Sequence, residues 1–187
     1  MTCVDAAEKS GDSEPRGAGQ FLRRVGRVLR LDTRVFDEVE ADPGALPQAA
    51  GIVLVAGVAR GVFGLALGGG PGFVGSLAGA IVLWLLATSL LTGVGARWVH
   101  GTTDFHETLR TLGFAAAPLW LLAPAFFVPS AAAGVAAVVV HAWAIAAAVI
   151  AVRQALDVAT ARALVACGIT LALALALLFL LGARMTP

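Results

Sequence analysis

Charged residues are scarce in this chain of 187 residues, and their scarcity excludes most classes of soluble protein. Only 13% of the residues are charged and 59% are hydrophobic, whereas an average soluble domain carries about 25% charged residues. The formal net charge is +1, so the charge balance does not predict a nucleic-acid partner. Most of the charges lie in the first 44 residues, and the rest of the chain is a series of apolar runs.

Cysteine and lysine are also rare. The two cysteines, Cys3 and Cys167, lie far apart in the sequence, so no disulfide framework is expected. Lys9 is the only lysine, and arginine supplies the remaining basic charge, a bias that suggests a GC-rich bacterial genome. No apolar run precedes residue 45, so we expect the first membrane span to act as its own uncleaved insertion signal.

The polar N-terminal part divides into two segments. Residues 1–17 are small and polar, and we predict a disordered tail. Residues 18–44 carry hydrophobic side chains at helical spacing, with arginines early and carboxylates late. This pattern predicts a cytoplasmic amphipathic helix on an anionic leaflet, although Asp32 could equally begin a second, shorter helix. Pro43 and Gly44 end the segment.

Residues 45–187 predict an all-α fold, a polytopic membrane bundle of about five transmembrane helices. A helix needs about 20 apolar residues to cross the hydrocarbon core. Four of the runs reach this length or nearly so, and the third is shorter and contains Pro118 and Pro124. The predicted spans are residues 46–67, 73–94, 114–128, 131–152 and 163–181.

The arginines predict the orientation of the bundle. The segment before the first span is basic, and the loops after the second and fourth spans contain Arg97, Arg110, Arg153 and Arg162. The loops after the first and third spans carry no charge. Because short cytoplasmic loops are enriched in basic residues, we expect a cytoplasmic N-terminus and an extracytoplasmic C-terminus in the bacterial cell membrane.

Arg60 lies inside the first predicted span, beside a stripe formed by Gly57, Gly61, Gly64 and Gly68. A glycine stripe permits close helix contact, so Arg60 is expected to point toward a neighbouring helix. An arginine at the centre of a span costs about 2.5–3.5 kcal/mol on insertion scales. It either extends to the outer headgroups or serves as a counter-charge for an anionic headgroup or substrate.

His141 lies in the middle of the fourth predicted span, on a face of small residues. A proton relay is one interpretation, but no acidic residue lies within a span to pair with it. We expect instead a neutral histidine that is hydrogen-bonded across helices, to Thr88 or Ser89.

The second loop is the most polar part of the membrane domain and contains His106, Glu107 and Arg110. A zinc protease presents His-Glu-x-x-His on a helix, but Arg110 stands where the second histidine would be, and a guanidinium does not ligate zinc. We therefore predict no catalytic residue, cofactor or metal. We expect an interfacial amphipathic helix whose start is capped by Thr103 or Asp104.

Gly113 and Pro118 join this loop helix to the third predicted span. Gly113 is expected to let the chain turn, and Pro118 to begin a new helix, where a missing N–H is tolerated. Pro124 is expected to kink that helix. A broken span of this kind is either simple architecture or part of a cavity wall.

The segment 101–118 resembles the hallmark of Yip-type (Ypt/Rab-interacting) membrane proteins. In that family a Gly-aromatic-x-x-x-Pro motif opens the third of five spans, and here it runs from Gly113 to Pro118, preceded by Arg110 as in bacterial members. The resemblance covers residues 28–182 and implies a five-helix membrane domain without a defined enzymatic activity. Eukaryotic members bind prenylated small GTPases in vesicle traffic, a role that does not transfer to a bacterial chain.

Two functions remain open. The first is a non-enzymatic membrane scaffold or organising protein, favoured by the basic N-terminal segment and by the lack of a nucleophile motif. The alternative is a small transporter or lipid-handling protein that uses Arg60 and His141. The expected partners are the lipid bilayer and either another membrane protein or a second copy of the chain, through the glycine stripes.

Overall fold

Every structural element of the protein is helical in the parts that the structure describes, which confirms the predicted all-α class. A computed structural model describes residues 16–66, 72–99 and 104–185, so the predicted tail lies almost wholly outside the described residues. The elements in chain order are α1 (Arg16–Leu29), α2 (Arg34–Ala41), η1 (Pro43–Ala45), α3 (Leu46–Ala66), α4 (Gly72–Val94), η2 (Gly95–Val99), α5 (Phe105–Ala115), η3 (Ala117–Leu122), η4 (Pro124–Phe127), α6 (Ser130–Ala155) and α7 (Thr160–Met185).

Five helical segments are long and apolar enough to cross a membrane, as predicted. The third begins at Phe105 rather than at Phe114, because α5 continues directly into the two 3-10 segments η3 and η4. The expected loop helix is therefore the first half of the third span, and its side chains from Thr108 to Thr111 are buried. The candidate spans are Pro43–Leu65, Gly72–Arg97, Phe105–Phe127, Ser130–Ala155 and Thr160–Leu177.

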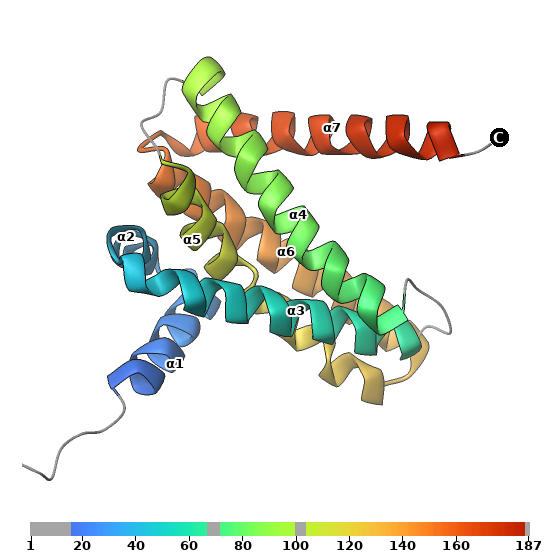
Figure 1. Ribbon diagram of the computed structural model, residues 1–187. Coiled ribbons are helices and arrows are strands. Elements are labelled where there is room, and N and C mark those ends of the chain that lie inside the picture. Colours follow the sequence, from blue (N-terminus) through green and yellow to red (C-terminus); the bar gives the residue numbers. More distant parts are fainter. Residues whose placement is uncertain (1–15, 67–71, 100–103, 186–187) are drawn as a thin grey trace, which may run out of the picture.

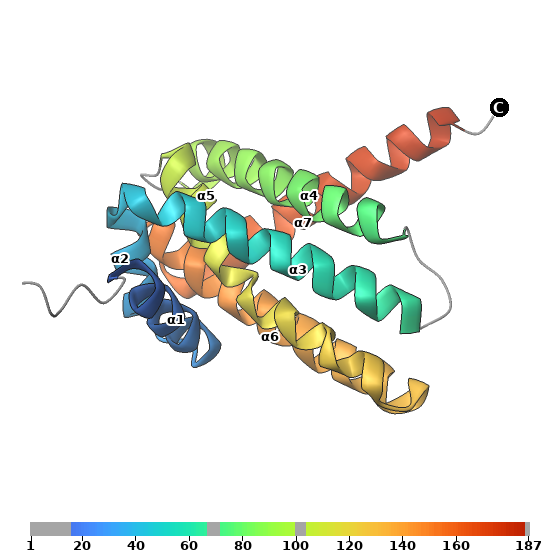
Figure 2. The same cartoon turned by 60° about the horizontal axis from the view of Figure 1, so that its bottom comes forward.

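The spans alternate in direction, so one end of the bundle collects the starts of α3, α5 and α7 and the ends of α4 and α6 (Figure 1). The short helices α1 and α2 lie at this same end, and we call them the cap (Figure 2). We call the opposite end of the bundle the distal end. The far part of α7 extends away from the other helices (Figure 1).

The cap and the bundle share one hydrophobic cluster. Val28 of α1 and Phe36 of α2 are fully buried, and they pack in one cluster with Ile52 of α3, Phe114 of α5 and Ala147 of α6. Phe21 also contacts Trp120, with 6.3 Å between the ring centroids. Because burying a large apolar side chain stabilises by about 1.5–3 kcal/mol, these contacts hold the cap against the bundle.

The predicted glycine stripe brings α3 against α4. A Cβ added to Gly57 would lie 3.0 Å from the Cα of Leu77, and a Cβ added to Gly61 would lie 3.3 Å from the Cα of Phe73. Only glycine permits this backbone approach without a shift of the neighbouring helix.

Gly113 has a different role from the predicted turn. It lies within α5, with no break of the helix. A Cβ added there would lie 2.7 Å from the Cβ of Ala49 and 3.2 Å from its Cα. The glycine therefore allows α5 to lie directly against the start of α3, at the centre of the fold.

This close approach predicts the effect of the substitution Gly113→Ala. Overpacking of a close-packed interior costs about 1–3 kcal/mol, so the melting temperature in detergent should fall. Gly134→Ala in α6 is the matched control, because a Cβ added to Gly134 meets nothing within 4 Å. Equal melting temperatures for the two variants would contradict the proposed contact between α5 and α3.

Candidate functional site

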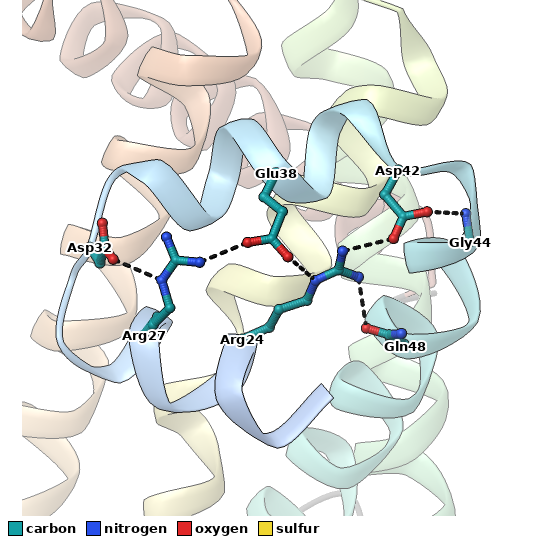
Figure 3. Close-up of polar contacts among 7 residues, drawn as sticks. All are labelled: Arg24, Arg27, Asp32, Glu38, Asp42, Gly44 and Gln48. Atoms are coloured by element: carbon teal, nitrogen blue, oxygen red, sulfur yellow. Dashed lines mark hydrogen bonds and ion pairs between the residues drawn. The ribbon is translucent and has the colours of Figure 1, made fainter. Parts of the chain in front are cut away.

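The cap is joined to the bundle by a buried arginine (Figure 3). The Arg24 side chain is 3% exposed. Its Nε donates to Glu38 at 2.9 Å, its Nη2 donates to Asp42 at 2.8 Å and its Nη1 donates to Gln48 at 3.2 Å. These acceptors come from α2, from the residue before η1, and from α3, so one guanidinium connects three successive segments.

A second arginine closes the cap on itself. Arg27 donates to Asp32 at 2.8 Å and to Glu38 at 2.7 Å, so Glu38 bridges both arginines (Figure 3). The hydrogen bond from Arg24 holds the pKa of the Glu38 carboxyl below its usual value, and the Arg27 bond adds to this. The basic half of the segment therefore pairs with its acidic half.

The sequence left open whether this segment forms one helix or two, and the structure has two. The chain reverses at Leu31, whose φ is 56°, a left-handed conformation that commonly ends a helix. The Asp32 carboxylate then accepts a hydrogen bond from the N–H of Arg34 at the start of α2. Asp32 thus stabilises the first turn of the predicted second helix, although the N-cap residue is Thr33, whose side chain makes no capping hydrogen bond.

Arg110, which replaces the second histidine of the metal motif, joins α5 to the cap. The side chain is 8% exposed, and its Nη2 donates to the backbone carbonyl of Glu40 in α2. Its Nε is buried and has no hydrogen-bond partner in the described part of the chain. Gln154 of α6 also donates to Asp37 of α2. The cap is therefore fastened by polar contacts to α5 and α6 as well as to α3.

Glu40 carries a raised pKa at this junction. Burial raises the pKa of its carboxyl to about 7, and the negative charges of Glu107, Asp157 and Asp37 act in the same direction, while Arg110 opposes them. A carboxyl with such a pKa is partly protonated near neutral pH. The junction between the cap and the bundle therefore contains a group that titrates in the physiological range.

His106 and Glu107 lie in the first turn of α5, and Glu107 takes part in the cap of this helix. Asp104 and Glu107 form the predicted helix cap, in which the Asp104 carboxylate accepts from the His106 N–H and the Glu107 carboxylate accepts from the Asp104 N–H. His106 is exposed and lies 3.4 Å from the Asp104 carboxylate. The described residues contain no group of three metal-ligating side chains, and His100 lies outside them.

Pro118 lies in the first turn of η3, as predicted, and Pro124 in the first turn of η4. Neither position requires a backbone donor. The second half of the third span is therefore built from two 3-10 segments, each with a proline in its first turn. Trp120 stabilises this broken stretch by donating to the carbonyl of Ile52 at 2.9 Å.

Arg60 and His141 lie on the same cavity, far from the cap. The cavity has a volume of about 490 Å³ and is bounded by α3, α4, η3 and α6, with Arg60, Ser76 and His141 as its polar lining. A second cavity of about 130 Å³ also includes Arg60 and continues between α3 and α4 toward α5. The structure thus brings together the two intramembrane residues that the sequence singled out.

The predicted partners of His141 are wrong. His141 Nδ1 lies 2.7 Å from the carbonyl of Ala137 in its own helix, and Thr88 and Ser89 donate to the carbonyls one turn before them in α4. Because small residues surround His141 along α6, its own backbone offers the nearest acceptor. Because a carbonyl oxygen can only accept, Nδ1 is the donor in this hydrogen bond.

These features define a multi-pass membrane protein with a folded polar cap. The sequence matches the family model described as the Yip1 domain over residues 28–181. The match covers most of the chain, so the protein belongs to the Yip1 domain family of membrane proteins, as the motif from Gly113 to Pro118 predicted. No curated protein and no solved structure matches the chain significantly.

The substitution Arg24→Met tests the junction between the cap and the bundle. It removes the charge while it retains most of the aliphatic side chain, so packing is largely preserved. We expect a loss of about 1–3 kcal/mol of unfolding free energy and faster proteolysis between α1 and α2. The matched control is Arg23→Met, whose side chain is exposed on the same helix. If both variants resisted protease as the wild type does, Arg24 would not secure the cap.

The pKa of Glu40 predicts a pH dependence of stability. In the unfolded chain this carboxyl releases its proton near its usual pKa of 4.5, and in the folded chain only near 7. The folded chain therefore holds this proton more tightly than the unfolded chain does. The resulting stability is fully present below about pH 4.5 and is lost as the pH rises to about 7.

The variant Glu40→Gln isolates this contribution, because glutamine does not titrate. We expect the variant to melt at a higher temperature than the wild type at pH 8, with a smaller difference at pH 5. Thermal unfolding in detergent at the two pH values measures the effect. A difference that stayed constant between pH 5 and pH 8 would contradict it.

Proposed function

We propose that this protein is a non-enzymatic membrane scaffold that organises its surroundings through the cap. The observation that carries this proposal is the burial of Arg24 among its acceptors, because it makes the cap a fixed part of the membrane domain. A basic helix held in place by a membrane bundle presents its outer side in a constant orientation. Such a surface suits recognition rather than chemistry.

The outer side of the cap combines charge with apolar area. Arg23 lies on α1 and Arg30 directly follows the last residue of that helix, and both are exposed, as is Arg34 at the start of α2. Leu22, beside Arg23, is 65% exposed. Basic residues together with an exposed leucine are typical of helices that lie against anionic headgroups, so we assign the leaflet next to the cap as its first partner.

The position of the basic residues supports a location of the cap in the cytoplasm. Arg97 lies in η2 directly after α4, Arg153 lies near the end of α6 and Arg162 near the start of α7. These ends collect beside the cap (Figure 1). Short basic segments are retained on the cytoplasmic side. We therefore infer a bacterial inner-membrane protein whose N-terminus is cytoplasmic and whose C-terminus is extracytoplasmic.

A second candidate function, lipid handling or transport of a small solute, is favoured by a different observation. Arg60 and His141 line one cavity within the membrane part of the bundle. In this function the ligand would bind at the cavity lined by Arg60 and His141, and the cap would not be required.

The scaffold function predicts the effect of reversing three exposed charges. The triple variant Arg23→Glu, Arg30→Glu and Arg34→Glu should lose its partners without unfolding, because Arg24 and Arg27 remain. In-cell cross-linking, purification in mild detergent and mass spectrometry identify the proteins and lipids that are retained. We expect a severalfold loss of anionic lipid or of a stoichiometric protein partner.

The control variant replaces the same three arginines by lysine and keeps the charge. It should retain what the wild type retains, since headgroup attraction depends on charge rather than on guanidinium geometry. Deletion of residues 18–42 is the more severe test of the same surface. If neither the charge reversal nor the deletion altered the retained partners, the scaffold function would be wrong.

A further inference from the structure

The larger cavity has one polar end and one apolar side. Arg60 and Ser76 supply polar groups near the distal ends of α3 and α4, whereas Leu83, Leu86 and Leu122 line the deeper part. Gly79 contributes to the open space, because a Cβ added there meets nothing within 4 Å. The lining is therefore amphipathic along its length, as a lipid is.

The helix geometry places this lining within one leaflet. Ser76 is four residues from the distal end of α4 and Arg60 is six residues from that of α3, which correspond to roughly 6 Å and 9 Å at 1.5 Å per residue. His141 is eleven residues from the distal end of α6, or roughly 16 Å. Half of a hydrocarbon core is about 15 Å thick, so the cavity extends from the distal headgroup region to the middle of the bilayer.

The charge of Arg60 specifies what the polar end accepts. The side chain is exposed, and it has no ion-pair or hydrogen-bond partner in the described part of the chain. No acidic residue lines either of the two cavities that include it. A guanidinium binds a phosphate through two parallel hydrogen bonds, which would offset the cost of a charge at this depth.

The lack of a carboxylate in the lining also separates two kinds of lipid. A zwitterionic headgroup brings an ammonium beside its phosphate, and the described lining offers no anion to receive that ammonium. His141 lies roughly 16 Å from the distal end of its helix, away from a headgroup, and its Nδ1 is hydrogen-bonded to the carbonyl of Ala137. The lining therefore favours a headgroup with negative charge alone.

We propose that this cavity binds an anionic phospholipid of the distal leaflet. The phosphate pairs with Arg60 and accepts a hydrogen bond from Ser76, and one acyl chain lies along the leucines toward His141. The inference rests on the second candidate function for its site and gives that function a ligand class. It is independent of the partners of the cap.

The test uses the full chain in mild detergent and native mass spectrometry, with phosphatidylglycerol and phosphatidylethanolamine as probes. We expect the wild type to bind phosphatidylglycerol more tightly. Arg60→Gln should weaken the binding of phosphatidylglycerol roughly tenfold, which is the effect of a lost charge-assisted hydrogen bond. Gly79→Leu should weaken the binding of both lipids, because the added side chain occupies the cavity. Leucine also has a higher helix propensity than glycine, so α4 should stay folded. His141→Leu should leave the preference for phosphatidylglycerol unchanged.

The outcomes separate this inference from the function on which it rests. If Gly79→Leu and Arg60→Gln, with melting temperatures equal to that of the wild type, both bound phosphatidylglycerol as the wild type does, the lipid site would be wrong. Competition by inorganic phosphate would also overturn it, because the site would then recognise a free anion. Lipid or solute flux is measured separately in reconstituted vesicles. Tight lipid binding without flux would exclude only the transport function.

Discussion

A buried guanidinium must be surrounded by acceptors, and the way this chain meets that requirement for Arg24 determines how its two parts join. Removing a charge from water costs several kcal/mol unless it is paired and hydrogen-bonded. Glu38, Asp42 and Gln48 supply the acceptors, and they lie on three successive segments. Arg24 reaches all three acceptors only when the cap is folded against the start of the first span, because Gln48 lies in α3. The polar segment is therefore part of the folded membrane domain, and its exposed arginines have a fixed direction.

The number of spans and their approximate ends could be predicted from the sequence because lipid leaves few alternatives. Within a bilayer each backbone donor and acceptor must be satisfied inside the segment, which restricts long apolar runs to helices. The close contact at the glycine stripe could also be predicted, since Gly57 and Gly61 lie on one face of α3 and permit a close approach there. The residue that caps the start of α5, Asp104, could also be predicted, because helix capping depends on residues that are neighbours in the sequence.

The candidate site was only partly predictable because its contacts join distant segments. The turn at Leu31 contains neither glycine nor proline, and although Asp32 indicated a possible second helix, no local pattern indicated that the basic half folds back onto the acidic half. One indication was present: Arg24 lies three residues after Phe21 and four before Val28, on the apolar face of α1. The bond between Arg110 and Glu40 spans 70 residues. The contact of Gly113 with Ala49 likewise depends on helix packing that spacing alone does not specify.

The central claim is that α2 is a buried part of the membrane domain, with Val35, Phe36 and Val39 fully shielded from solvent. Hydrogen–deuterium exchange of the full chain in lipid nanodiscs tests this claim most directly. The account predicts that the amide protons of α2 are protected from exchange together with those of α5, because α2 opens only when the cap separates from the bundle. Exchange of the α2 amides at the rate of an unprotected peptide, with α5 still protected, would contradict it.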